Sequence, residues 1–458
     1  AHLRGGNSYF SGGLFRFAYN GLEDVLELIP EISQKERGSI DVGTYPESAF
    51  YSDVMRVTEG LSDPELVQTL VSQSYPAMGW MRDQGVRWIL SYGRQAFQQQ
   101  GIMRFWGGVI VEAVGAGKGL SDRLIELVER AGVDVFYQTG ATGLSTDNRG
   151  RVVGLTVRGP EGFRDISARS VVLACGGFEA NSEMRARYLG PGWELAKVRG
   201  TQFNNGDGIR MALDIGAQPY GHWSGCHAVA WDLNAPPYGD RNIADLFQKH
   251  SYQFGLIVNI TGKRFVDEGA DFRNYTYVKY GREILLQPQR VAFQLFDDKI
   301  VHLLRDEYSI PQASMVRANT IQELAQRLGI DREELSETVS QFNSSVQVGE
   351  FDPTVLDGKG TDGIDPPKSN WALPLDTPPY LGYAVTCGIT FTFGGLKING
   401  QAQVVDTEDV PIPGLYAAGE LVGGLFYNNY PGGTGLMAGT VFGKIAGERA
   451  AQAASGGS

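Results

Sequence analysis

The placement of glycine constrains this chain more than any other feature. Its 61 glycines cluster beside short apolar runs, at positions 5–13, 107–119, 205–208, 394–395, 419–424 and 432–439. Because glycine has no Cβ, such clusters are typical of tight turns and of places where the backbone approaches a ligand closely. The apolar runs beside them predict buried strands, which we expect at 152–157, 171–174, 256–260 and 415–417.

Helical patterns alternate with these strands. In residues 120–131 the apolar positions recur three and four apart, and Ser121 can cap the helix. A strand is expected directly after it, at 133–137. Further helices are predicted at 206–215, 320–328, 332–343 and 435–451. This alternation favours an α/β fold.

The character of the sequence changes in its middle third. Aromatic and charged residues increase from about 231, and a polar stretch at 357–368 is expected to be a linker. Strand and glycine-loop signals return after it. We therefore expect a first domain part at 1–230, an inserted α+β capping and substrate domain at 231–368, and a second part of the first domain at 369–458.

Composition excludes several classes of function. A net charge of −12 gives no basic field for nucleic acid or an anionic membrane surface. Three cysteines without a CxxC pair, together with five histidines, give no disulfide framework and no haem or zinc motif. No apolar run approaches the roughly 18 residues of a membrane span. We expect a cytoplasmic globular protein and, since the chain opens directly on a glycine turn, a fragment or a processed form.

Four glycine-containing segments carry the functional signal. Segments 4–13 (RGGNSYFSGG) and 170–178 (SVVLACGGF) place glycine pairs where backbone N–H groups can lie against a flat or anionic ligand. Segment 413–420 (PGLYAAGE) ends on Glu420, a carboxylate suited to ribitol or ribose hydroxyl groups. Segment 429–436 (NYPGGTGL) ends where a helix begins, and the dipole there favours negative charge. Each segment alone could be an ordinary turn or a buried strand, whereas their order is informative.

These segments belong to a longer series of motifs. In order they read VVLACGGFEAN, NNGDGIRMALDIGA, GKRFVDEGADFRN, IPGLYAAGELVGG and YPGGTGLMAGTVFGKIAGE. The series resembles the FAD-dependent fumarate reductase/succinate dehydrogenase flavoprotein superfamily over nearly the whole chain. The details RGGNS, WSGCHAVAWD and VDEGADFRNYTY look most like its tricarballylate dehydrogenase branch. The resemblance implies a Rossmann-like, glutathione-reductase-type FAD-binding domain with an inserted capping domain.

The resemblance also implies which residues contact FAD. They are Gly5, Gly6, Asn7, Ser8, Gly12, Gly13, Ala141, Ala174, Cys175, Gly176, Asn205, Asp207, Gly419, Glu420, Thr434, Gly435 and Leu436. Non-covalent FAD is expected, because Gly6 stands where membrane-bound relatives carry the flavin-linked histidine. The N-terminal GxGxxG unit of such proteins is missing from the sequence, and Gly115, Gly117 and Gly119 have the wrong spacing to replace it. One alternative is therefore a truncated, non-catalytic homologue.

Catalytic roles also follow from the resemblance. Arg273 matches the arginine that shuttles a proton while flavin N5 exchanges a hydride with the substrate, and Glu268 or Asp271 could relay that proton. His227 matches a histidine that binds the substrate carboxylate. The structural alternatives are an ordinary ion pair for Arg273 and a core histidine for His227.

Two positions depart from the fumarate reductase pattern. Phe391 replaces a substrate-binding histidine, and Tyr430 replaces a carboxylate-clamping arginine. Tyr-Pro-Gly at 430–432 is similar to 3-ketosteroid Δ1-dehydrogenases, in which the tyrosine donates a hydrogen bond to a substrate carbonyl. We expect a dehydrogenase that moves a hydride between flavin N5 and a carbon α or β to a carboxylate, with Tyr430 and His227 holding oxygens. A ketosteroid-type enzyme is the alternative, and electrons would leave to a separate acceptor.

Overall fold

The computed structural model describes residues 1–105 and 107–456 and separates them into two compact units. Unit 1 comprises Ala1–Glu194, Gly200–Cys226 and Phe391–Ser458, and unit 2 comprises Leu195–Arg199 and His227–Thr390. The main segment of unit 2 thus begins at His227 and ends at Thr390, whereas the sequence predicts an inserted domain at 231–368. The strands β12 (Pro219–Asp232) and β16 (Tyr380–Leu396) have residues in both units.

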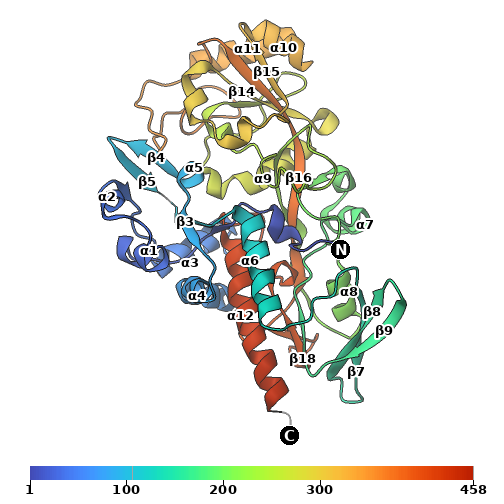
Figure 1. The fold of residues 1–458 in the computed structure, drawn as a ribbon. Coiled ribbons are helices and arrows are strands. Elements are labelled where there is room, and N and C mark those ends of the chain that lie inside the picture. The colour runs from blue at the N-terminus through green and yellow to red at the C-terminus, as the bar shows by residue number, and fades with distance from the viewer. Residues whose placement is uncertain (106, 457–458) are drawn as a thin grey trace. The chain divides into compact units, whose positions relative to one another are not determined.

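Unit 1 alternates helices with short strands (Figure 1). Its helices are α1 (Leu22–Leu28), α2 (Gln34–Arg37), α3 (Glu47–Val57), α4 (Pro64–Asp83), α5 (Tyr92–Gln95), α6 (Ala116–Arg130), α7 (Ser182–Met184), α8 (Asp207–Leu213) and α12 (Thr434–Ser455). The long helices α4 and α12 pack against each other, and α12 also contacts the strands β10 (Val171–Leu173) and β18 (Pro411–Ala417). Helix α12 therefore packs both against α4 and against the sheet that contains β10 and β18.

The described part of unit 1 also contains four three-stranded sheets. Their strands are β1 (Leu14–Phe15), β6 (Val111–Ala113) and β3 (Trp88–Leu90); β2 (Ile40–Asp41), β5 (Ile102–Phe105) and β4 (Ala96–Gln99); β7 (Gly140–Thr146), β8 (Val152–Gly159) and β9 (Gly162–Ser167); and β10, β18 and β17 (Gln403–Val405). In the last sheet β10 runs parallel to β18, with Val171 opposite Leu415. This parallel pair sets the ends of two predicted FAD-binding segments beside each other.

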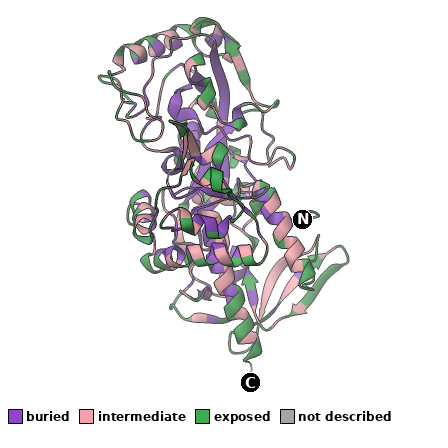
Figure 2. Cartoon of the chain, turned by 60° about the vertical axis from the view of Figure 1, so that its left-hand side comes forward, coloured by how far each residue is buried: buried purple, intermediate pink, exposed green. Residues whose placement is uncertain are grey.

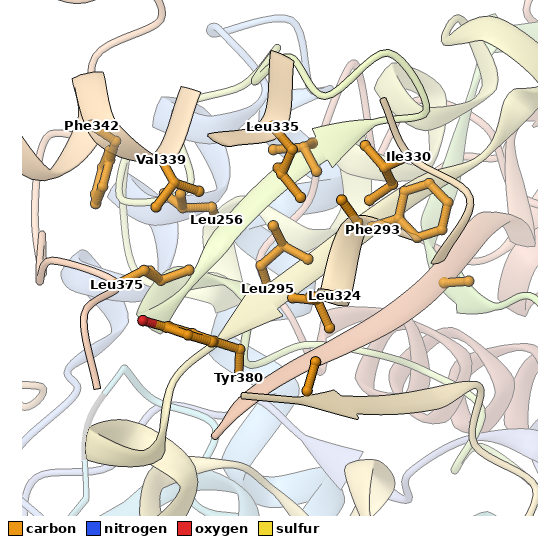
Figure 3. Packing of buried hydrophobic residues seen from close by; sticks show 14 of the residues in the cluster. Leu256, Phe293, Leu295, Leu324, Ile330, Leu335, Val339, Phe342, Leu375 and Tyr380 are labelled. Carbon is orange, nitrogen blue, oxygen red and sulfur yellow. The ribbon is translucent and has the colours of Figure 1, made fainter. Parts of the chain in front are cut away.

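Unit 2 is built on one six-stranded sheet. Its strands are β11 (Lys197–Val198), β12, β13 (Leu256–Asn259), β14 (Ala292–Phe296), β15 (Met315–Ala318) and β16, and its helices are α9 (Tyr277–Leu285), α10 (Ile321–Leu328) and α11 (Arg332–Ser345). A buried core of leucine, isoleucine, valine and aromatic side chains joins α10 and α11 to β13 and β14 (Figure 3). Unit 2 therefore has a hydrophobic core of its own.

Most of the predicted elements form, and two expectations are wrong. Residues 133–137 form no strand, and Val133 and Phe136 are 55% and 56% exposed. The reason is that a strand needs a hydrogen-bonding partner, and no strand in the described part of the chain pairs with this segment. The stretch 357–368 is no linker, since it lies within unit 2 and its last residue, Lys368, is buried there.

Burial varies between elements (Figure 2). Strand β14 is buried along its whole length, whereas β9 has no buried residue. Among residues 1–105 and 107–456, no helix combines the length and apolar character needed to cross a bilayer.

Candidate functional site

The N-terminal glycine segment of unit 1 forms a turn that leads into a 3₁₀ helix, η1 (Asn7–Phe10). Its partner is the start of α6: a Cβ on Gly117 would lie 2.2 Å from the carbonyl oxygen of Ser8, and one on Gly13 would lie 2.6 Å from the Ala116 carbonyl carbon. Glycine is required at both points because the two backbone segments touch. Five of the six residues predicted from this segment, Gly5, Gly6, Asn7, Ser8 and Gly13, thus line or support one turn. The sixth, Gly12, is buried.

Asn7 connects this turn to a buried carboxyl pair. Its Nδ2 donates to Glu179 Oε1 at 2.7 Å, while its Oδ1 accepts from the backbone N–H of Thr201 at 2.9 Å. Glu179 interacts with Glu420, and burial together with that neighbouring carboxylate raises the pKa of Glu179 well above its usual range. The pair therefore retains a proton to unusually high pH.

Glu420 is held in place by two further donors. Its Oε1 accepts from the backbone N–H of Thr392 at 2.8 Å, and its Oε2 accepts from Asn204 Nδ2 at 3.2 Å. Burial raises the pKa of Glu420 as well. The carboxylate predicted for a ribitol or ribose chain is thus fixed beside a second carboxyl group, a combination suited to hydroxyl groups that donate and accept.

The end of β10 and the start of α8 form a second cradle. Ala174 and Cys175 are exposed at the end of β10, and a Cβ on Gly208 in the first turn of α8 would lie 2.1 Å from Cys175 Sγ. A Cβ on Gly176 would lie 2.2 Å from Asn204. Asn205 and Asp207 flank Gly206, which takes a left-handed conformation directly before α8. Ala141 lies on β7, which α8 also contacts.

The start of α12 is a third cradle. Gly433 is left-handed, Thr434 is fully buried and donates through Oγ1 to the Pro431 carbonyl at 2.6 Å, and Gly435 and Leu436 are partly exposed. Arg16 Nε donates to the Gly432 carbonyl at 2.9 Å. This buried arginine thereby supports the loop that leads into the helix.

An aromatic cluster lies beside the start of α12. The rings of Phe391 and Tyr430 are 5.3 Å apart and nearly perpendicular, and Phe426 lies 5.2 Å from Tyr430. A Cβ on Gly435 would lie 3.7 Å from the Phe391 ring and 3.9 Å from the Tyr430 ring. The two positions that depart from the fumarate reductase pattern are therefore brought together, next to a residue predicted to contact FAD.

Unit 2 contains a buried cluster of cationic and imidazole groups. Arg199 Nη2 donates to Gln248 Oε1 at 3.1 Å and lies 3.9 Å from Asp245 Oδ2. His227 is buried on β12, and burial together with the charge of Arg199 holds its pKa well below the usual range. His227 is therefore a neutral imidazole at physiological pH.

Arg273 belongs to the same cluster. It opens the 3₁₀ helix η5 (Arg273–Tyr275), is buried, and its Nη1 lies 3.4 Å from Nδ1 of His250. The Tyr277 ring contacts both histidines edge-on, at 5.1 Å from His227 and 4.8 Å from His250. The two histidines and Arg273 are thus gathered around Tyr277.

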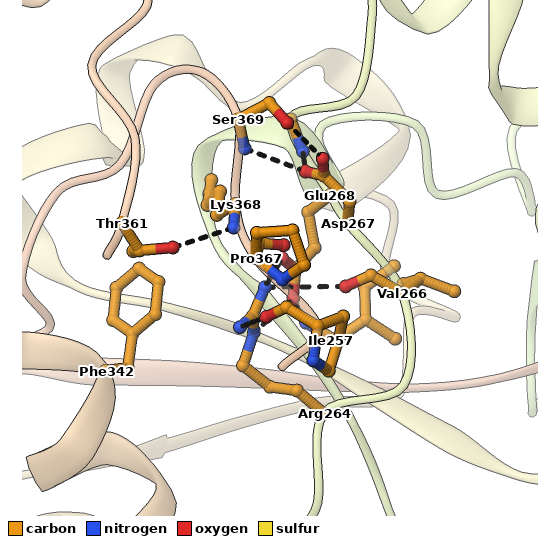
Figure 4. A network of polar contacts seen from close by, with 12 residues as sticks. Ile257, Arg264, Val266, Asp267, Glu268, Phe342, Thr361, Pro367, Lys368 and Ser369 are labelled. Atoms are coloured by element: carbon orange, nitrogen blue, oxygen red, sulfur yellow. Dashed lines mark hydrogen bonds and ion pairs between the residues drawn. The ribbon is translucent and has the colours of Figure 1, made fainter. Parts of the chain in front are cut away.

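Glu268 occupies a different environment in unit 2. It is fully buried, accepts the backbone N–H of Ile257 at 2.8 Å and forms an ion pair with Arg264 (Figure 4). These contacts are those of a structural ion pair. The proton relay proposed for Glu268 stays a prediction.

Several site residues were not identified from the sequence. They are Arg16, Glu179, Asn204, Arg199 and His250. Arg16 could have been identified from the sequence, because it is a charged residue inside the apolar run LFRFAY. Glu179 and Asn204 lie inside the motifs VVLACGGFEAN and NNGDGIRMALDIGA, whereas Arg199 and His250 lie outside the motifs that carry the resemblance.

The residues of unit 1 fit FAD. Gly6 and Gly419 both have positive φ, and the space into which a Cβ would project is open at each. A flavin ring or a polyol chain could lie against the backbone there. The first turn of α12, where the helix dipole favours negative charge, and the carboxyl groups of Glu420 and Glu179, which suit hydroxyl groups, would hold the cofactor.

Comparisons with known proteins agree with this fit. A probable fumarate reductase of Shewanella frigidimarina is 29% identical over 88% of this chain and 64% of its own length. A 3-oxosteroid 1-dehydrogenase of Mycobacterium tuberculosis is 30% identical over 71% of this chain and 61% of its own length. The open form of a flavocytochrome c3 fumarate reductase has a TM-score of 0.70 at 27% identity, over 98% of this chain and 72% of that one. The chain spans less than two thirds of the length of both enzymes compared by sequence.

The chain also matches a protein family over most of its length. The profile of the FAD binding domain family covers residues 35–436. That range includes the carboxylate Glu420, the start of α12 and both histidines of the unit 2 cluster. The chain therefore belongs to the family of FAD binding domains, and FAD is its cofactor.

Proposed function

We propose that this chain is an FAD-dependent oxidoreductase that acts on a carbon–carbon bond next to a carboxylate. The observation that carries this proposal is the cluster of Arg199, Arg273, His227 and His250 in the interior of unit 2. Two buried guanidinium groups beside two imidazoles suit an anionic substrate group, because a planar carboxylate matches the geometry of guanidinium.

Each residue has a role in this proposal. FAD, when bound, accepts or supplies the hydride at N5. Arg199 and Arg273 bind carboxylate oxygens, and His227, neutral at physiological pH, orients the same group by a hydrogen bond. Arg273, together with the relay predicted for Glu268 or Asp271, would exchange a proton with the carbon next to the carboxylate. The dehydrogenase direction removes that proton and the hydride together, so that a double bond forms.

Within this class, a tricarballylate-like substrate is the finer proposal. Arg305, which is buried in unit 2 and adds its positive charge to the surroundings of His250, gives the cluster a third guanidinium. A tricarboxylate offers one carboxylate for each arginine. A separate electron acceptor and a cytoplasmic location belong to the same proposal and rest on the motifs and the cysteine composition.

A 3-ketosteroid-type dehydrogenase is the second candidate. The aromatic cluster of Phe391, Phe426 and Tyr430 in unit 1 favours it, because such rings suit an apolar substrate and the tyrosine hydroxyl could donate to a ketone. The 3-oxosteroid 1-dehydrogenase relative also supports this candidate. The buried arginines of unit 2 favour a carboxylate substrate instead, because a steroid ketone carries no negative charge that could pair with them.

One anaerobic experiment separates the two candidates. The FAD-loaded protein is mixed with tricarballylate, with succinate and with a 3-ketosteroid, and bleaching of the flavin absorption is followed. Bleaching by a carboxylate, lost in Arg273→Met but kept in the surface control Arg327→Met, is the expected result. Bleaching by the ketosteroid alone would replace the first candidate with the second.

A further inference from the structure

His222 supports the loop that carries Tyr430, although no motif includes it. It lies on β12 within unit 1, directly before the segment WSGCHAVAWD. Its Nδ1 accepts the backbone N–H of Asn428 at 3.0 Å. Because a backbone N–H can only donate, the proton of the neutral imidazole is on Nε2. A side chain 206 positions away thus holds the backbone two residues before Tyr430.

The backbone at Asn428 adopts a conformation that needs support. Its φ is +58°, in the left-handed region that few residues other than glycine adopt readily, and asparagine is one of these few. The N–H of Asn429 donates to the Tyr427 carbonyl across this residue, so that the chain turns sharply. The side chain of Asn429 then accepts the N–H of Tyr430 at 2.9 Å. The turn at Asn428 therefore determines where Tyr430 leaves the loop.

The ring of His222 is itself held in one orientation. It lies nearly parallel to the Tyr427 ring, with 5.7 Å between the centroids and 8° between the planes. The Phe393 ring lies 6.4 Å from it and packs in turn against Phe391 at 5.5 Å. A Cβ on Gly225 would lie 2.2 Å from Nδ1, so glycine is required there for the imidazole to keep its position. Strand β12 thus presents Nδ1 to the loop.

Tyr430 lies between two fixed points of this loop. Before it, the contact with His222 holds the turn. After it, Arg16 Nε donates to the Gly432 carbonyl at 2.9 Å. The Tyr430 side chain is buried and packs edge-on in the aromatic cluster of unit 1. A shift of the turn would therefore move the Tyr430 hydroxyl group relative to the start of α12, which is predicted to contact FAD.

We propose that His222 is a positioning residue that fixes the turn at Asn428 and thereby holds the Tyr430 hydroxyl group in place for a substrate oxygen. This inference rests on the proposed function, in which that oxygen belongs to a carboxylate or, in the second candidate, to a ketone. It assigns His222 no contact with the substrate and no proton transfer. The neutral imidazole acts only as an acceptor for the backbone.

Two substitutions of nearly equal size separate the acceptor from the packing. In His222→Asn the amide oxygen can take the place of Nδ1, whereas His222→Leu has no acceptor, and both variants lack the ring that stacks on Tyr427. With the FAD-loaded protein and an artificial electron acceptor, kcat/KM is measured for tricarballylate and for a 3-ketosteroid. The exposed His302 provides the matched control, as His302→Asn and His302→Leu.

We expect kcat/KM to fall by about tenfold or more in His222→Leu and to stay within about threefold of the wild type in His222→Asn, because a displaced hydroxyl group no longer meets the substrate. Circular dichroism and the flavin spectrum should not change. In the background of Tyr430→Phe, His222→Leu should cause no further loss, since both act through one hydroxyl group. Equal losses in the two His222 variants, no loss in His222→Leu, or a full further loss in the Tyr430→Phe background would overturn the inference.

NMR tests the same arrangement without turnover. We expect the proton of the His222 ring to be on Nε2 at pH 8, and the ring signals of Tyr430, assigned with Tyr430→Phe, to move in His222→Leu but not in His222→Asn. A proton on Nδ1 of the wild type would overturn the inference even where the variants fail to fold, and so would Tyr430 signals that stay in place in His222→Leu. Failure of the proposed function looks different: neither substrate would then bleach the flavin, while the Tyr430 signals still respond to His222→Leu.

Discussion

Arg264 holds both carboxylate oxygens of Glu268, with Nε 3.1 Å from Oε1 and Nη2 2.5 Å from Oε2 (Figure 4). The pair is buried, and Glu268 also accepts a backbone N–H from β13. Removing one partner of a buried ion pair leaves an uncompensated charge, which costs about 3 kcal/mol or more. We therefore predict that Glu268→Gln lowers the free energy of unfolding by about that amount, as measured by urea denaturation.

The control is Glu448→Gln, which removes an exposed partner of Lys444 on α12 and should change stability by less than about 1 kcal/mol. Were Glu268→Gln as stable as the wild type but inactive with an intact flavin spectrum, Glu268 would be a proton relay and not a structural residue.

The carboxyl pair of Glu179 and Glu420 predicts a dependence of stability on pH. Burial and the neighbouring carboxylate raise the pKa of Glu179 in the folded protein above the value of about 4.5 that it has when unfolded. The folded state therefore binds the proton more tightly. This contribution to stability is fully present below pH 4.5 and is lost as the pH rises through the raised pKa.

Glu179→Gln removes this titration but keeps an oxygen that can accept from Asn7. We predict that the melting temperature of the FAD-free variant falls less between pH 5 and pH 8 than that of the wild type. The surface variant Glu183→Gln, on α7, should follow the wild type. An unchanged slope in Glu179→Gln would mean that the pair is ionised throughout this range.

The sequence was most informative where local patterns coincide with tertiary burial. The apolar runs before glycine turns became β8, β10, β13 and β18, and the periodic segment at 120–131 became most of α6. Residues 133–137 carry an equally apolar pattern and still form no strand, because pairing depends on a partner strand that periodicity cannot supply.

The polar contacts of the site could be predicted less well from the sequence. Asn7 and Glu179 are 172 positions apart, and nothing in either segment indicates that a carboxyl group meets an amide there. His250 stands 23 positions before Arg273 in a segment without a motif. The resemblance identified Arg273, whereas its contact with His250 depends on how the loop before the 3₁₀ helix η4 (Tyr252–Phe254) packs.

Arg199 should control the ionisation of His227. Burial is the larger cause of the lowered His227 pKa, and the charge of Arg199 is the second. Arg199→Met removes that charge and keeps an apolar stem against Trp231, over whose ring the guanidinium lies at 5.6 Å. We predict that the pKa of His227 rises in this variant, as measured by NMR titration of the histidine ring.

The Arg199→Met variant should also bind carboxylates at least about tenfold more weakly than the wild type, because a bidentate hydrogen-bond donor is lost. Arg327→Met, which removes an exposed arginine from α10, is the control for both measurements. A His227 pKa that does not move would show that Arg199 is screened from the ring, and the shared anion site of these two residues would then be wrong.

A substitution at Tyr430 can separate the packing of the aromatic cluster in unit 1 from hydrogen bonding by the Tyr430 hydroxyl group. Tyr430→Phe keeps the edge-on contacts with Phe391 and Phe426 and removes only the hydroxyl group. Stability and the flavin spectrum should therefore stay close to those of the wild type. If the hydroxyl donates to a substrate oxygen on which charge develops, kcat/KM should fall by about 100-fold, as measured by steady-state kinetics with an artificial electron acceptor.

The matched control is Tyr188→Phe, which removes a hydroxyl from the neighbouring aromatic group of Phe178 and Trp223 and should leave kcat/KM unchanged. The substrate also matters. A fall in kcat/KM with a ketosteroid but not with a carboxylate would assign Tyr430 to the ketone and favour the second candidate function. Turnover retained by Tyr430→Phe with every substrate would restrict Tyr430 to packing against Phe391.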